Sequence, residues 1–282
     1  MNKSLKSFVH LTSFELNRLF KFLLTLIGVT VISNLVGFIL LPMQYTNRIN
    51  QFVVQENSST QQALEQFDYF SFDRVTHSFW VIGPVALGII AFLFYSFFIW
   101  YREWFGKNTF AYRLLMLPIS RIHIYFSKLL IIFVGIFSLV SIQLISLYIG
   151  YQIGQAIVPT EFLQATTFIQ MLYSQVTFHY VLPIESGMFF YAIGIGVVFL
   201  LVLFTMILME RSFSIKGVVM GMAYGLIALI ITLAPFALGN ILNNRYILYD
   251  SELAILVSIL LLMIGVVSIV VSRYLLNHKV TI

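Results

Sequence analysis

The stretch REWFGKNTFAYRLLMLPISRIHIYFSK, residues 102–128, lies between two long apolar runs and carries five of the sixteen Lys and Arg residues of the chain. The chain has 282 residues, of which 60% are hydrophobic and 10% charged. A soluble domain is about half apolar and about a quarter charged. A globule of this size has too little interior for so many apolar side chains, so the composition predicts a membrane protein.

Six segments are apolar enough to cross about 30 Å of hydrocarbon, which takes about 20 residues of helix. We therefore expect an all-α fold, a single polytopic helix bundle over residues 1–282. The predicted transmembrane helices are residues 20–43, 78–101, 129–150, 187–209, 217–239 and 253–272. Apart from Lys21, none of them contains an Asp, Glu, Lys or Arg. The absence of charge inside the spans argues against a proton-coupled carrier.

Charge placement predicts the orientation of these spans. Six spans put both termini on the same side, and a cytoplasmic location for the termini leaves only Arg48, Arg74 and Arg245 outside. Basic residues are retained on the cytoplasmic side of membrane proteins. We expect a multi-pass protein of the cell (plasma) membrane with both termini in the cytoplasm. The segment 102–128 then faces the cytoplasm.

The N-terminal segment, residues 1–19, has an apolar stripe at helical spacing with Lys6 on the other side. This pattern predicts an interfacial amphipathic helix, and the alternative is a lead-in to the first span. Outside the membrane, residues 44–77 form a polar loop with a possible short helix at 60–67. Residues 151–186 carry Phe162, Ala165, Phe168, Ile169 and Leu172 at helical spacing. That segment is either a helix on or in the outer membrane face, or a segment packed against the spans.

The segment 102–128 itself predicts two short helices. Asn108 is suited to cap a helix that begins at Thr109, and Pro118 ends it because the residue before a proline avoids the α conformation. Ser120 then starts a second helix, which continues through Lys128 into the third span. The first of these helices lies across the membrane surface. From the residues alone it is either a docking element for a soluble partner or a surface helix with no partner.

Several residues of this segment match a known pattern, namely an acid, a glycine, Leu-Pro, Ser-Arg and a lysine that leads into a span. They are Glu103, Gly106, Leu117-Pro118, Ser120-Arg121 and Lys128. With the six spans and the N-terminal helix, the chain resembles permease subunits of ABC-2 type exporters. The resemblance implies that the cytoplasmic helix is a coupling helix that docks on an ATPase. The residues it implies for this coupling are Glu103, Gly106, Phe110, Arg113, Leu114, Leu117, Pro118 and Arg121. The outer connection 240–252 is shorter than in many members of that family.

The resemblance also implies the partners. They are a cytoplasmic ABC ATPase, a second permease subunit in a homodimer or heterodimer, and the lipid bilayer, with no nucleic acid. The chain has no phosphate-binding loop of the G-x-x-x-x-G-K-[ST] type, so ATP would bind to the partner. We expect no enzyme activity, no metal site and no cofactor in this chain, and an amphipathic or apolar cargo. The alternative function is a non-transporting membrane sensor, scaffold or assembly factor. An intramembrane enzyme is disfavoured, because no polar residues converge inside the predicted spans.

Gly217, Gly221 and Gly225 recur at every fourth position of the fifth predicted span. Such spacing places three glycines near one face of the helix and permits another helix to approach closely. The pattern favours helix packing, either within the subunit or at a mobile or dimer-facing surface.

Overall fold

The computed structural model describes residues 3–56, 59–104, 120–174, 178, 186–241 and 249–279. Six helices in this part of the chain are long and apolar enough to span a membrane. No β-strand occurs among the described residues; one isolated bridge is the only β pairing. The prediction of an all-α, six-span membrane bundle is confirmed.

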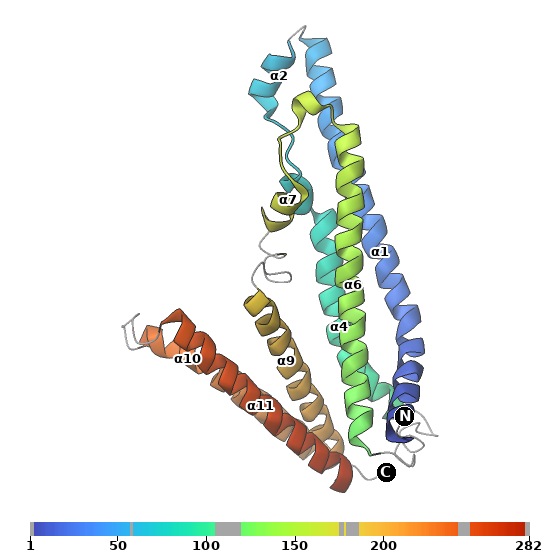
Figure 1. The fold of residues 1–282 in the computed structure, drawn as a ribbon, viewed down its shortest axis with the longest axis vertical. Helices are drawn as coiled ribbons and strands as arrows, with labels where there is room; N and C mark the ends of the chain where they lie inside the picture. The colour runs from blue at the N-terminus through green and yellow to red at the C-terminus, as the bar shows by residue number, and fades with distance from the viewer. Residues whose placement is uncertain are drawn as a thin grey trace. The chain divides into compact units, whose positions relative to one another are not determined.

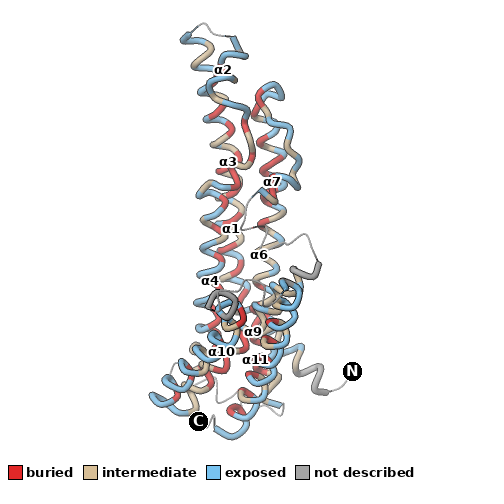
Figure 2. Tube along the Cα trace, turned by 90° about the vertical axis from the view of Figure 1, so that its left-hand side faces the viewer, coloured by how far each residue is buried: buried red, intermediate tan, exposed pale blue. Residues whose placement is uncertain are grey.

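Five predicted spans lie inside one long helix each, and the span predicted at 78–101 begins one residue before its helix (Figure 1). The helices are α1 (Lys3–Gln55), α4 (Phe79–Trp104), α6 (Ile122–Ile157), α9 (Ser186–Phe213), α10 (Ile215–Ile241) and α11 (Asp250–His278). Shorter elements connect them: α2 (Thr60–Phe67), α3 (Asp73–Thr76), a 3-10 turn at Thr160–Phe162 and α7 (Phe168–Ser174). Buried and exposed residues alternate along the long helices (Figure 2), as expected when one face packs and the other meets lipid.

Helix α1 is longer than any membrane requires. Its 53 residues extend about 80 Å at 1.5 Å per residue, against about 30 Å of hydrocarbon. The predicted interfacial segment 1–19 is helical from Lys3 onward and continues into the first span without a break. Its location at the membrane surface stays a prediction. Pro42 lies within the same helix, and the hydroxyl of Thr46 donates a hydrogen bond to the Pro42 carbonyl at 3.0 Å.

The chain divides into two compact units, and each is described by itself. Unit 1 comprises residues 1–15, 94–130 and 184–282, and unit 2 comprises residues 16–93 and 131–183. In unit 2, α2 and α7 lie toward one end of α1 and α6 (Figure 1). This end carries the predicted outer loops. We therefore call α2, α3, the 3-10 turn and α7, together with the ends of α1 and α6 beside them, the outer head.

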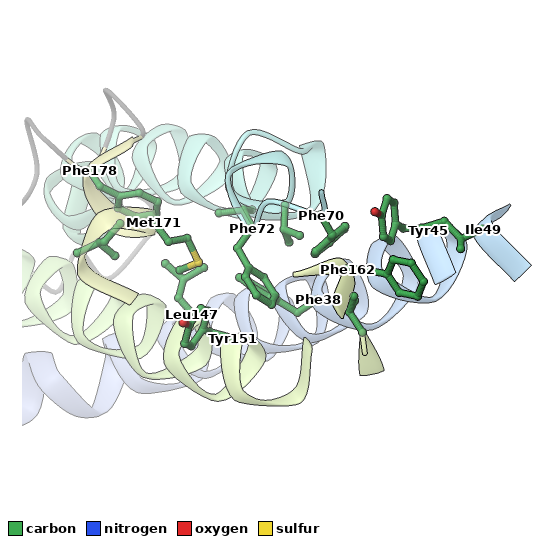
Figure 3. Close-up of a cluster of buried hydrophobic side chains, with 14 of the residues drawn as sticks. Phe38, Tyr45, Ile49, Phe70, Phe72, Leu147, Tyr151, Phe162, Met171 and Phe178 are labelled. Atoms are coloured by element: carbon green, nitrogen blue, oxygen red, sulfur yellow. The ribbon is translucent and has the colours of Figure 1, made fainter. Parts of the chain in front are cut away.

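An aromatic cluster forms the core of the outer head (Figure 3). The ring of Phe72 lies 4.8 Å from that of Tyr151, 5.4 Å from that of Phe70 and 6.2 Å from that of Phe38, measured between centroids. Such ring pairs contribute about 0.5–1.5 kcal/mol each beyond the area they bury. The cluster therefore joins α1, α6 and the segment that precedes α4 into one packed body.

The structure tests both predictions for the outer segments. The short helix at 60–67 is confirmed, and Ser59 caps it in a capping box with Gln62. A continuous helix over 162–172 is wrong, because Leu163 is extended and pairs with Phe70. The amide of Phe70 donates to the Phe162 carbonyl at 2.8 Å, and the amide of Gln164 donates to the Phe70 carbonyl at 3.0 Å. Between residues 162 and 172 the α-helix begins only at Phe168, and the segment packs against the spans of its own chain.

In unit 1, α9 and α10 form a tight helical hairpin. The two helices are separated by Ser214 alone, which adopts a positive φ of 54°. Helix α9 also packs against α11. The hydroxyl of Thr205 lies 2.9 Å from that of Ser272, and the Tyr224 hydroxyl lies 2.6 Å from that of Ser268. These polar contacts connect α11 with both α9 and α10.

A buried ionic cluster as the candidate functional site

Four charged side chains of unit 1 meet at the ends of α1, α4 and α6. Lys128 lies in the second turn of α6 and is completely buried. Its ammonium donates hydrogen bonds to the Glu103 carboxylate and, at 3.0 Å, to the carbonyl of Ile99. The ammonium also lies 3.4 Å from the Glu15 carboxylate. We call Glu15, Arg102, Glu103 and Lys128 the ionic cluster.

Arg102 completes the ionic cluster by donating from Nη2 to Oε2 of Glu15 at 2.8 Å. Two acids and two bases leave no formal net charge. Glu15 and Glu103 are exposed by only 1% and 3%, so water does little to screen these charges. Loss of one partner from a buried pair leaves an uncompensated charge and costs about 3–5 kcal/mol. The arrangement therefore holds three helix ends together as long as every member is present.

The ionic cluster changes how two predicted residues are interpreted. The resemblance implies that Glu103 takes part in coupling to an ATPase, and the sequence predicts that Lys128 leads into the third span, yet both are buried within the chain. Ion pairing explains the difference, because each charge satisfies the other. In this structure Glu103 joins the end of α4 to α6, and its carboxylate faces Lys128 rather than the surface.

Glu15 was missed by the sequence analysis. It is one helical turn from Leu11 and one from Leu19, and all three are buried. Val9 and Phe20 are among the apolar residues at helical spacing in this region, yet both are exposed. The sequence does contain an indication of this burial, because Glu15 has a leucine four residues before it and another four residues after it. A carboxylate on such an apolar face requires a cationic partner.

Arg121 lies just before α6, and its guanidinium donates a hydrogen bond to the carbonyl of Leu276. Leu276 is in the last turn of α11, where carbonyls lack helical partners and a positive charge is favourable. Arg121 therefore caps a helix of its own chain, although the resemblance assigned it to the ATPase surface. Through this bond the beginning of α6 is attached to the end of α11.

The remaining predicted coupling residues lie outside the described residues. They are Gly106, Phe110, Arg113, Leu114, Leu117 and Pro118. The transverse coupling helix therefore stays a prediction. What the structure describes are the two ends of this segment, Trp104 and Ser120, and the ionic cluster formed by the helices that flank it.

The three glycines of the fifth span face α9 of the same chain. A Cβ at Gly217 would collide with the carbonyl oxygen of Met209, and one at Gly221 would lie 3.0 Å from the carbonyl oxygen of Met206. At Gly225 the nearest atom is the sulfur of Met206, at 2.8 Å. The glycines thus permit close approach of α10 to α9.

Polar residues also converge inside the spans, contrary to the expectation from sequence. In unit 2 the amide nitrogen of Asn34 donates to Gln143 at 3.0 Å and to Ser146 at 2.7 Å. All three residues are buried, and these bonds connect α1 with α6. The polar side chains hydrogen-bond to one another between the two helices, and such bonds help transmembrane helices to associate. No group of three His, Asp or Glu residues suited to a metal ion occurs in the described part of the chain.

No protein-family model, curated protein or solved structure matches the chain. The features of the chain that bear on its function are therefore the sequence pattern and the ionic cluster.

Proposed function

We propose that this chain is the membrane-spanning subunit of an ATP-driven exporter of the ABC-2 type. ATP is hydrolysed by a separate cytoplasmic nucleotide-binding subunit, and the cargo is amphipathic or apolar. The permease pairs with a second permease subunit in the plasma membrane, and both of its termini face the cytoplasm. The observation that supports this proposal most directly is the contact between Glu103 and Lys128, which fastens the two ends of the proposed docking segment to each other.

The contact between Glu103 and Lys128 lies at the end of α4 and near the beginning of α6. A partner that pushes on residues 105–119 applies its force to the end of α4 and the beginning of α6. Because Glu15 of α1 is part of the same ionic cluster, three spans receive the force together. A rupture that left one charge unpaired would cost several kcal/mol, so the three helix ends move as one body.

Arg121 extends this connection toward the C-terminal spans. Its bond to the Leu276 carbonyl attaches the start of α6 to α11, which packs against α9. In a transporter, motion must reach all spans that line the path of the cargo. These attachments provide a route within unit 1 from the docking segment to the hairpin of α9 and α10.

The proposal is tested by co-purification. We would purify the tagged chain from its native membranes in mild detergent and identify associated ATP-binding polypeptides by photolabelling with an azido-ATP. Arg113→Glu and Leu114→Asp should each reduce recovery of the labelled partner about tenfold or more, as expected for a desolvated contact at an interface. Glu65→Lys is the control, because Glu65 is an exposed charge on α2.

Two outcomes would contradict the proposal. If no ATP-binding polypeptide accompanies the wild-type chain, the function is that of a non-transporting sensor, scaffold or assembly factor. If both variants recover as much partner as Glu65→Lys, the ATPase docks elsewhere and the assignment of residues 105–119 is wrong.

A further inference from the structure

Arg211 has an unusual environment in unit 1. It lies in the last turn of α9, with its guanidinium carbon 4.5 Å from the ring centroid of Tyr101 and 5.7 Å from that of Trp104. Both aromatic residues belong to the last turn of α4. A flat guanidinium stacks well on aromatic faces, so the two rings fix its position.

This guanidinium has no anionic partner among the described residues. The neighbouring Glu210 carboxylate instead accepts a hydrogen bond from the hydroxyl of Tyr101. The described ion pairs involve Glu15, Arg102, Glu103 and Lys128, and Arg211 takes part in none of them. A positive charge held by two rings therefore lacks a counter-ion within the part of the chain that the structure describes.

Two buried nitrogens at this place also have no hydrogen-bond acceptor among the residues that the structure describes. They are Nε of Arg211 and the indole Nε1 of Trp104. An unpaired buried donor is costly, and native structures usually satisfy such groups with a ligand, an ion or water. Neither nitrogen can accept a hydrogen bond. A group that satisfies both nitrogens has to bring acceptor oxygens, and the charge of Arg211 favours a negative one.

The position of these residues along their spans indicates what kind of anion would bind to Arg211. Tyr101 follows the apolar part of α4, and Arg211 follows the apolar part of α9, so both lie where their spans end. Tyr and Trp are enriched at this level of a bilayer, which is the level of the lipid phosphates. Basic pockets between transmembrane helices bind anionic headgroups. We propose that Arg211 and Trp104 form a binding site for the phosphate of an anionic phospholipid, with Tyr101 as its stacking platform.

This site is independent of the exporter proposal, because it requires neither an ATPase nor a cargo. The Arg211 guanidinium donates to the phosphate oxygens, and the Trp104 indole supplies a further donor. A zwitterionic phospholipid carries its own cation beside the phosphate, so it gains less from Arg211. The site therefore prefers phosphatidylglycerol to phosphatidylcholine.

The test measures lipid binding to the delipidated full-length chain in detergent. Native mass spectrometry would follow titration with phosphatidylglycerol and, separately, with phosphatidylcholine. Arg211→Gln should weaken phosphatidylglycerol binding about 10-fold or more, as expected for a charge-assisted hydrogen bond. Trp104→Phe keeps a ring but removes the N–H, and it should weaken binding about 3-fold or more. The control Lys216→Gln removes an exposed charge at the start of α10 and should change binding less than about twofold.

Several outcomes would overturn the proposal. Equal losses in Arg211→Gln and Lys216→Gln would mean that general surface charge attracts the lipid. If Trp104→Phe, which should fold normally, binds phosphatidylglycerol as well as the wild type does, the indole is not part of the site and the proposal is wrong. Displacement of phosphatidylglycerol by an excess of inorganic phosphate would assign the site to the free ion. Retention of the lipid under phosphate, with loss in both site variants, is the result we expect.

Discussion

The ammonium of Lys128 and the carboxylate of Glu103 form a buried ion pair across the ends of α6 and α4, 25 residues apart in the chain. Neither side chain has appreciable contact with water. A pair of this kind contributes little net stability compared with apolar residues of similar size, but it penalises the loss of one member strongly. Its value to the protein is that the two helix ends separate only at a high energetic cost.

Removal of one charge from the ionic cluster should therefore destabilise the protein more than removal of both members of an ion pair. We expect Lys128→Met to lower the free energy of unfolding by about 3–5 kcal/mol, because Glu103 remains buried and unpaired. The double variant Lys128→Met with Glu103→Gln should recover most of this loss. Thermal unfolding of the purified chain in detergent measures both effects, and Lys216→Met serves as an exposed control. A double variant that is as unstable as the single one would show that shape, and not charge pairing, governs this site.

The hairpin of α9 and α10 predicts a strong position dependence for glycine substitutions. Gly217→Ala should destabilise the protein by about 1–3 kcal/mol, because the new methyl group meets the backbone oxygen of Met209 and backbone cannot move aside easily. Gly225→Ala should cost less, since only the flexible side chain of Met206 is in the way.

The matched control for the hairpin is Gly194→Ala in α9, where a Cβ would meet no atom within 4 Å. Alanine is favoured over glycine in a helix by about 0.5–1 kcal/mol, so this variant should be as stable as the wild type or more so. Thermal unfolding with helicity as the signal compares the three variants with the wild type. A Gly217→Ala variant of wild-type stability would contradict the close approach of the two helices.

The aromatic core of the outer head should be sensitive to truncation. Phe72→Ala removes a buried ring that contacts three others, and it should cost about 3–5 kcal/mol. Val54→Ala on the exposed end of α1 should change stability by less than about 0.5 kcal/mol. Limited proteolysis of the two variants would report the effect, with faster cleavage of residues 44–77 in Phe72→Ala alone. Equal cleavage rates would show that Phe72 does not hold the outer head together.

The predicted orientation can be tested directly, because the chain has no cysteine. A membrane-impermeant maleimide applied to intact cells should label Glu65→Cys, at an exposed position of α2, and should leave Thr109→Cys unlabelled. After the cells are opened, both variants should react. The reverse pattern would place the segment 102–128 outside the cell. A cytoplasmic ATPase could then not dock on this segment.

The six spans could be predicted from sequence because the bilayer imposes a simple local requirement. Most residues near the middle of a span must be compatible with hydrocarbon, and about 20 mostly apolar residues in a row are visible without knowledge of any contact. The helix at 60–67 was visible for a similar reason, since its cap involves residues three positions apart. In both cases the determining interactions are local in the chain.

The ionic cluster, by contrast, was decided by tertiary structure. Glu15 and Lys128 are 113 residues apart, and the sequence of each helix alone does not show that the two side chains face each other. The bridge between Phe70 and Leu163 likewise prevented a helix that residue spacing favoured, because the backbone found partners in a distant segment. The sequence by itself determined which segments enter the membrane, through hydrophobicity. Only the tertiary structure decided which charged and aromatic side chains meet, because pairing depends on the directions in which separate helices present them.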